Sequence, residues 1–127
     1  LAIGGASTSG PVASIEAAVI HLDGTLDPFV TTAARLGTAR AGASTAVIGD
    51  RLFVAAGTGP SGLLASVESS AIGPSGALLG FSDEAAALST ARSDSSAVVL
   101  GNQLTLIGGQ SATGATPLIE TAVAGPR

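Results

Sequence analysis

Short apolar runs separated by two-residue polar breaks recur along the chain, and the clearest example lies between residues 43 and 57. Ala43–Ile48 is a run of small and β-branched residues, and Arg51–Ala56 is a second run that Gly57 ends. Gly49-Asp50 between them is one of the dipeptides that favour a two-residue hairpin turn. The pattern therefore predicts two antiparallel strands joined at Gly49-Asp50.

A third strand is predicted at Ala65–Ile72, where apolar and polar positions alternate in part. Val67 and Ala71 fall on one side of this strand, and Glu68 and Ser70 fall on the other. Alternation of this kind is typical of a strand with two different faces.

A fourth strand is predicted from Phe81 to about Ala85, after the turn-forming sequence Gly73-Pro74-Ser75-Gly76. Glycine and proline in such clusters mark turns. Four strands within about 50 residues is the size of one blade of a β-propeller.

The whole pattern repeats with a spacing of 52 residues and no gap. Glu16, Glu68 and Glu120 are separated by this interval, and Thr38-Ala39-Arg40 returns as Thr90-Ala91-Arg92. When each residue from 1 to 75 is compared with the residue 52 positions later, 25 of the 75 pairs are identical. A repeat of this length indicates an array of similar structural units.

These residues resemble the kelch repeat. The resemblance rests on VIGDRLFVAAG and VLGNQLTLIGG, followed by a loop, then S-[IV]-E, an aromatic residue and T-A-R. The glycine doublet stands at Gly4-Gly5 and Gly108-Gly109, while the middle copy has Ala56-Gly57. HLDGTLDPF, residues 21–29, is similar to a variant of bacterial kelch-like proteins. The resemblance covers essentially the whole chain and implies an all-β propeller with four-stranded antiparallel blades.

The aromatic positions depart from the kelch pattern. The family has a tyrosine and a tryptophan in the third and fourth strands, but this chain contains neither. We expect Phe29 and Phe81 at the tryptophan position, with small residues packing the blades.

The strand pattern predicts about two and a half blades within residues 1–127. We expect a partial blade at 1–35, a complete blade at 36–87 and a second partial blade at 88–127. Propellers close with four to eight blades, and repeat units need buried neighbours or caps. We therefore expect this chain to be a fragment of a longer protein, with further blades as its neighbours; completion of the ring by several chains is the alternative.

Composition narrows the classes of partner. The chain has a net charge of −4, and its five arginines are scattered, so the clustered cations of a nucleic-acid-binding protein are missing. No apolar run reaches the roughly 18 residues of a membrane-spanning helix. Cysteine is absent, which excludes disulfides and thiolate metal sites.

One motif suggests nucleotide chemistry when it is considered alone. Gly57-Thr58-Gly59-Pro60-Ser61-Gly62 matches G-x-G-x-x-G after a predicted strand. The cognate loops Gly5–Gly10 and Gly109–Gly114 keep only the outer glycines, and LLASVESSAIG after the motif is a poor helix sequence. We therefore interpret the motif as a blade loop.

The recurring glutamates and arginines are open to a catalytic interpretation, because a carboxylate beside an arginine can perform acid–base chemistry. Recurrence argues for structure, since an active site is needed once and a blade contact is needed in every blade. We expect these pairs to tie the third strand to the linker between blades. The residues assigned to the repeat framework are Glu16, Glu68, Glu120, Arg40, Arg92, Phe29, Phe81, Gly5, Gly57 and Gly109.

His21 is the only histidine, and its counterparts are Gly73 and Gly125. A single histidine without cysteine does not form a transition-metal site, and we interpret His21 as an exposed turn residue rather than a triad member. Asp23 and Asp27 lack the ligand spacing of an EF-hand. We expect no catalytic residue, no metal and no cofactor.

The predicted function is a non-catalytic binding or structural module of an exported or cell-surface bacterial protein, although the residues leave a cytoplasmic location open. The kelch resemblance implies binding of a protein or glycan through one propeller face. The residues expected in the loops of that face are Ser7, Thr8, Ser9, Thr58, Ser61, Ser111 and Thr113, with linkers Gly37–Gly42 and Ser89–Asp94. The alternative is part of a kelch-propeller enzyme, similar to sugar oxidases or epimerases, with its active site in blades outside this chain.

Overall fold

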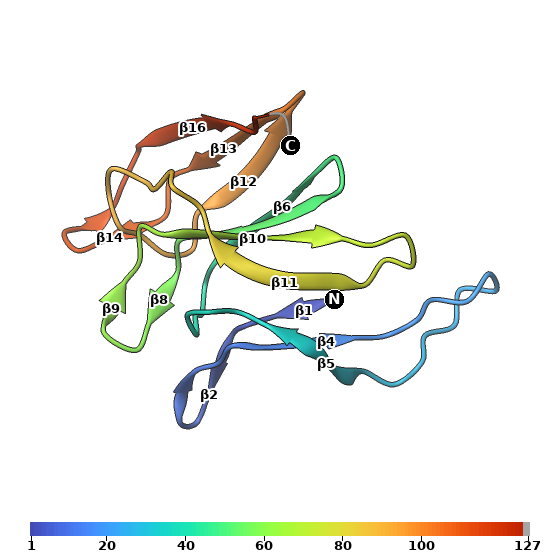
Figure 1. The fold of residues 1–127 in the computed structure, drawn as a ribbon. Helices are drawn as coiled ribbons and strands as arrows, with labels where there is room; N and C mark the ends of the chain where they lie inside the picture. Colours follow the sequence, from blue (N-terminus) through green and yellow to red (C-terminus); the bar gives the residue numbers. More distant parts are fainter. Residues whose placement is uncertain (126–127) are drawn as a thin grey trace.

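Three antiparallel sheets stack on one another in the computed structural model, which describes residues 1–125 (Figure 1). No helix occurs among these residues, and every sheet pairing is antiparallel. The first sheet has the order β1-β4-β5, the second β11-β10-β7-β6 and the third β12-β13-β16. The all-β class with antiparallel sheets is therefore confirmed.

The strands of the first sheet are β1 (Ala2–Ile3), β4 (Ser14–Ala17) and β5 (Val30–Arg35). Those of the second sheet are β6 (Ser44–Ile48), β7 (Arg51–Ala55), β10 (Val67–Ile72) and β11 (Leu78–Asp83). Those of the third sheet are β12 (Ser96–Leu100), β13 (Gln103–Ile107) and β16 (Ile119–Val123). In each sheet the strands lie in chain order, so each is an antiparallel meander.

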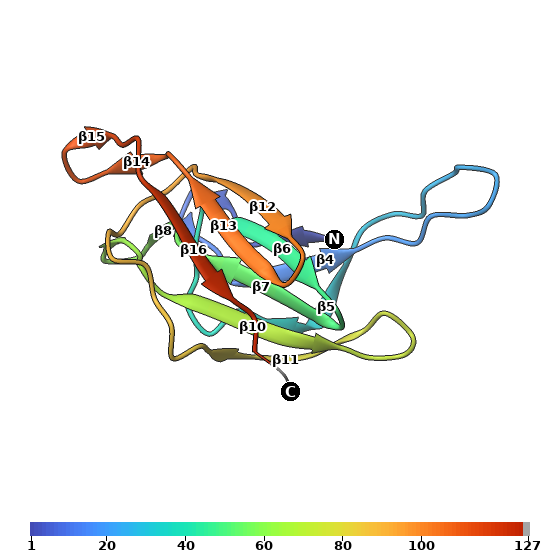
Figure 2. The same cartoon turned by 90° about the horizontal axis from the view of Figure 1, so that it is seen from above.

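Three small two-stranded hairpins project from the sheets at one common end of the stack (Figures 1 and 2). They are β2 (Ala6–Ser7) with β3 (Gly10–Pro11), β8 (Thr58–Gly59) with β9 (Gly62–Leu63), and β14 (Gln110–Ser111) with β15 (Gly114–Ala115). We call this the hairpin end. Each hairpin connects two strands that pair with each other in one sheet: β1 with β4, β7 with β10, and β13 with β16.

The hairpin predicted at Gly49-Asp50 is present. β6 pairs with β7 from Ser44↔Ala55 to Ile48↔Arg51, so Gly49 and Asp50 alone form the connection. The third strand also falls within the predicted Ala65–Ile72 segment. Its burial does not alternate as predicted, because Val67, Glu68, Ser69 and Ser70 are all buried. Both faces of the second sheet are covered, so polar side chains of β10 on either face are removed from solvent.

The fourth strand begins earlier than the sequence predicted. β11 spans Leu78–Asp83, so Phe81 lies inside the strand rather than at its start. The reason is the turn before it: Gly73 N donates to Ala77 O over 2.8 Å, and the chain reverses at once. Pairing with β10 then starts at Ile72↔Leu78.

The core consists of two layers, one on each side of the second sheet. Toward the first sheet, Leu52 and Val54 of β7 cluster with Leu36, and Phe81 packs against them. Toward the third sheet, Phe53 and Ala55 of β7 cluster with other buried residues that include Ala56, Val67, Leu104 and Leu106. Because successive side chains of a strand point to opposite faces, β7 supplies both layers. All four of these β7 side chains are at least 93% buried, and area removed from water is the main stabilising term.

The 52-residue repeat is visible in the backbone hydrogen bonds even where the residues differ. Gly4 N donates to Ser14 O, Ala56 N to Ser66 O and Gly108 N to Leu118 O, with distances of 3.0, 3.0 and 2.9 Å. The backbone at Gly4, Ala56 and Gly108 has nearly the same φ, at 62°, 62° and 65°. The repeat is therefore a repeat of backbone geometry, including one position where alanine takes a left-handed conformation.

Candidate functional site

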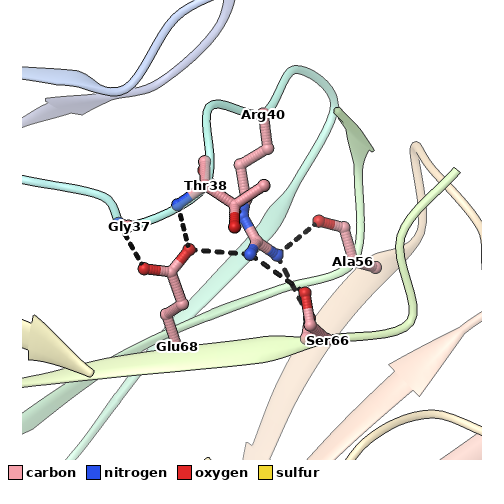
Figure 3. A network of polar contacts seen from close by, with 6 residues as sticks. All are labelled: Gly37, Thr38, Arg40, Ala56, Ser66 and Glu68. Atoms are coloured by element: carbon pink, nitrogen blue, oxygen red, sulfur yellow. Dashed lines mark hydrogen bonds and ion pairs between the residues drawn. The ribbon is translucent and has the colours of Figure 1, made fainter. Parts of the chain in front are cut away.

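The recurring arginine and glutamate meet in a buried ion pair between two elements of the repeat. Arg40 lies in the linker between β5 and β6, and Glu68 lies in β10 (Figure 3). Arg40 Nη2 lies 2.7 Å from Glu68 Oε2, and the two side chains are 0% and 1% exposed. Charge-assisted hydrogen bonds of this length are among the stronger polar contacts in proteins.

Backbone groups and the Ser66 hydroxyl are the other partners of the two side chains, and Arg40 Nη2 donates to Ser66 Oγ at 3.1 Å. Arg40 Nη1 donates to Ala56 O at 2.9 Å and to Ser66 O at 3.1 Å. Glu68 accepts from Gly37 N at 2.6 Å and from Thr38 N at 3.2 Å. A Cβ at Gly37 would lie 3.0 Å from Glu68 Oε1, so glycine allows the carboxylate this close approach. These contacts hold the linker against the strand.

The second copy of the pair repeats three of these contacts, but Arg92 Nε has no hydrogen-bond partner among the described residues, whereas Arg40 Nε donates to Thr38 O at 3.4 Å. Arg92 Nη2 lies 2.8 Å from Glu120 Oε2, and Arg92 Nη1 donates to Leu118 O at 3.0 Å. Ser89 N donates to Glu120 Oε1 at 2.6 Å, as Gly37 N does to Glu68. Arg92 is fully buried, whereas the Glu120 side chain is 23% exposed.

The pKa of Glu120 is lowered from its ordinary value of 4.5. Burial works to raise the pKa, but it is outweighed by hydrogen bonds from Ser89, the charge of Arg92 and a hydrogen bond from the Thr90 backbone. The carboxylate is thus held in the charged form that the linker requires.

The backbone of each linker also binds the sheet on its other side. Gly5 N donates to Arg40 O and Gly57 N donates to Arg92 O, both at 2.8 Å. Each arginine residue therefore connects two successive sheets, one through its carbonyl and the next through its guanidinium. Glycine is required at position 57, where φ is 101° and a Cβ would lie 2.8 Å from Ala41 O. At Gly109 the corresponding distance, to Ser93 O, is 2.4 Å.

Linkers and hairpins are joined at the hairpin end. Ala41 and Thr58 exchange two backbone hydrogen bonds, and Ser93 and Gln110 exchange two in the same way. The predicted loop residues therefore lie at the same end of the stack as both linkers (Figure 1). This end is assembled from backbone groups and small side chains.

The hydroxyls at the hairpin end fall into two kinds. Ser7 Oγ donates to Gly10 O at 3.1 Å, and Ser111 Oγ donates to Gly114 O at 3.0 Å, so both serve their own turns. Thr8, Ser9, Ser61 and Thr113 are exposed, whereas Thr58 and Ser111 are half-buried. The exposed hydroxyls are the groups that a ligand can reach.

Two predicted aromatic positions have different surroundings. Phe81 packs against the Leu36–Leu52–Val54 cluster, whereas Phe29 precedes β5 and is 49% exposed. The equivalence of sequence position therefore does not extend to burial.

The G-x-G-x-x-G segment does not lead into a helix. Gly57–Gly62 continues into the β8–β9 hairpin and then into β10. The helix N-terminus that a dinucleotide motif requires is therefore missing from this segment, which forms a hairpin.

His21 and the nearby aspartates lie on an exposed hairpin. His21 Nε2 lies 2.9 Å from Asp27 Oδ1, and both side chains are about half exposed. Asp23 Oδ1 accepts from Thr25 N at 2.9 Å and from Thr25 Oγ1 at 2.7 Å, and these bonds lower the pKa of Asp23. Within residues 1–125 no three His, Asp or Glu side chains gather as metal ligands.

One polar cluster was missed by the sequence analysis. Arg51 Nη2 donates to Ser69 Oγ at 2.6 Å, and the Ser69 hydroxyl donates to Glu84 Oε1. Arg51 also lies 3.9 Å from Glu84 Oε1. Arg51 and Glu84 do not recur at the repeat spacing: Gln103 stands 52 positions after Arg51. The repeat pattern therefore gave no indication of this cluster.

No protein-family model and no curated protein matches this chain. The part of the chain that the structure describes contains no helix long and apolar enough to cross a membrane.

Proposed function

We propose that this chain is a non-catalytic binding or structural module built of kelch-type repeats. In this proposal the three sheets are successive blades of a β-propeller that has further blades, and the protein is exported or displayed at a bacterial cell surface. The partner is a protein or glycan bound through the hairpin end.

The observation that carries the proposal is the use of the repeated charged residues. Arg40 with Glu68 and Arg92 with Glu120 make equivalent contacts in two copies, and each pair fastens a linker to a strand. Groups that do the same structural task twice are poor candidates for a single active site. The meander order of each sheet and the packing of successive sheets are compatible with propeller blades.

The hairpin end supports a binding role because loops held on a rigid scaffold are where recognition residues concentrate. Thr8, Ser9, Ser61 and Thr113 are exposed there and carry hydroxyls, and no charged residue lies in the three hairpins. Such a surface suits a neutral, hydrogen-bonding ligand such as a glycan hydroxyl or a peptide backbone.

The test uses two exposed serines at opposite ends of the second sheet. The chain is screened on an array of immobilised glycans and against a displayed peptide library, and the strongest ligand is then titrated. Ser61→Arg, at the hairpin end, should weaken binding at least about tenfold, which corresponds to 1.4 kcal/mol. Ser75→Arg, in the turn at the opposite end, should leave the affinity unchanged.

Three results would contradict the proposal. They are the absence of any ligand on both screens, an affinity that falls with Ser75→Arg rather than Ser61→Arg, and turnover of a sugar by the chain. The last result would favour the enzyme alternative.

A further inference from the structure

Glu16 of β4 and three apolar residues of the long β4–β5 connection are exposed. We call this set, Glu16, Ile20, Leu26 and Phe29, the open face. Ile20 is 73%, Leu26 53% and Phe29 49% exposed, and Glu16 is also exposed. Ile15, the neighbour of Glu16 in β4, is fully buried, which places Glu16 on the opposite face of the sheet.

Each member of the open face has a counterpart 52 residues later that is buried or partly buried. Glu68 is the counterpart of Glu16, and it is 1% exposed in the ion pair with Arg40. Ile72, Leu78 and Phe81 are the counterparts of the three apolar residues, and all three pack against the Leu36–Leu52–Val54 cluster. Leu36 belongs to the linker between β5 and β6, so the linker that leads into a sheet is part of what covers this surface.

Glu16 occupies the same place in its sheet as Glu68. Glu16 pairs with Ala2 of β1 and Thr31 of β5. Glu68 pairs with Val54 and Asp83, which are the residues 52 positions later. Among residues 1–125 the Glu16 side chain makes no hydrogen bond or ion pair, whereas Glu68 and Glu120 each bind an arginine and a linker amide.

Glu68 and Glu120 show which groups a partner of Glu16 would have to supply. Each copy supplies one guanidinium and at least one backbone N–H from a linker that ends in Thr-Ala-Arg. A planar guanidinium is suited to a carboxylate at the edge of an apolar surface, because it is weakly hydrated and donates several hydrogen bonds. The apolar part of the open face requires the apolar residue of the same linker, as Leu36 shows in the second sheet.

The first strand of the first sheet, β1, has an unpaired edge among the described residues. β7 pairs with β6 and β13 pairs with β12, but β1, which is equivalent to them, pairs only with β4 among the described residues. An unpaired strand edge is a template for another strand.

We propose that the open face is the docking surface for one further copy of the linker and first strand of this repeat. The occupant is a segment with the pattern of residues 36–52. Its arginine binds Glu16, its leucine covers Ile20, Leu26 and Phe29, and its strand pairs with β1. This inference rests on the repeat architecture of the proposed function but does not depend on the ligand of the hairpin end.

The test builds the occupant onto the chain. A copy of residues 36–52 is fused ahead of Leu1, which keeps the 52-residue register because Leu1 is equivalent to Phe53. The melting temperature should rise by at least about 5 °C relative to a fusion that carries the same segment in scrambled order. Replacing the arginine of the copy by glutamine, or Glu16→Gln in the fused chain, should remove most of this rise.

Glu16→Gln in the chain without the fusion is the matched control and should shift the melting temperature by less than about 1 °C. The proposal would be overturned if the fusion had the same melting temperature as its scrambled control. It would also be overturned if Glu16→Gln left the rise in melting temperature unchanged. Dimerisation of the unfused chain that Glu16→Gln abolishes would overturn it as well, because a second copy would then be the occupant. Ligand titration at the hairpin end is a separate measurement, so failure of the binding proposal is distinguishable from failure of this one.

Discussion

Arg40 Nη2 and Glu68 Oε2 lie 2.7 Å apart with no solvent exposure of the arginine side chain, although 28 residues separate them in sequence. The pair joins a linker to the third strand of the second sheet, and backbone groups and the Ser66 hydroxyl make further hydrogen bonds to it. Breaking a buried pair by removing one charge leaves the other uncompensated in a medium of low polarity.

Glu68→Gln should therefore lower the free energy of unfolding by about 3–5 kcal/mol. The reason is that the Arg40 guanidinium remains buried without its counter-charge. Urea denaturation of the purified chain measures this loss.

The chain offers its own control for this substitution. Glu16→Gln changes the same residue type at the equivalent strand position, but Glu16 is exposed, so the expected change is within about 0.5 kcal/mol. Equal losses for the two variants would mean that the buried ion pair has no special role.

Acidification should weaken the contact between the third sheet and its linker through Glu120. The pKa of Glu120 is lowered in the folded protein because hydrogen bonds from Ser89, the Arg92 charge and the Thr90 backbone outweigh the effect of burial. The folded state therefore binds the proton less tightly than the unfolded state does. The stabilisation is complete above about pH 4.5, the ordinary value, and is lost as the pH falls through the lowered value.

The measurement compares the wild type with Glu120→Gln in urea denaturation between pH 7 and pH 3. The difference in unfolding free energy between the two proteins should be largest near pH 7 and should shrink below pH 4.5. Other carboxylates titrate in both proteins, so their contribution cancels in the difference. A difference that grows on acidification would have the wrong sign for this account.

Gly57 and Gly62 provide a matched pair for separating steric collision from backbone conformation. Both have positive φ, at 101° and 122°. A Cβ at Gly57 would lie 2.8 Å from Ala41 O, whereas a Cβ at Gly62 would meet nothing within 4 Å. Gly62→Ala should therefore lower stability by about 1–2 kcal/mol through the backbone alone.

Gly57→Ala should lower stability by at least about 2 kcal/mol more than Gly62→Ala, because the linker must also move away from the β7–β8 connection. Thermal and urea unfolding of the two variants decide the comparison. If the two losses were equal, the close approach of the linker to Gly57 would not be needed for the packing of the sheets.

The pattern of the sequence was sufficient for the local elements and for their repetition. Apolar runs around Gly49-Asp50 predicted the β6–β7 hairpin, and the 52-residue spacing predicted equivalent roles for Arg40 and Arg92. The hairpin prediction succeeds because a two-residue turn is decided by neighbouring residues. The two arginines are equivalent because the whole unit that surrounds each of them is repeated. The early start of β11 was missed because it depends on the Gly73 to Ala77 hydrogen bond, which closes the turn sooner than the position of Phe81 suggested.

By itself, the sequence determined an all-β chain of similar units and identified the residues that recur in each unit. Only the tertiary structure decided which copies of those residues are engaged: Glu68 is buried and Glu16 exposed, and Phe81 is packed while Phe29 is open. The physical reason is that a side chain is buried only where a neighbouring element covers its face of the sheet. Equivalent positions of a repeat therefore differ in burial when one has a neighbouring sheet and the other has none among the described residues.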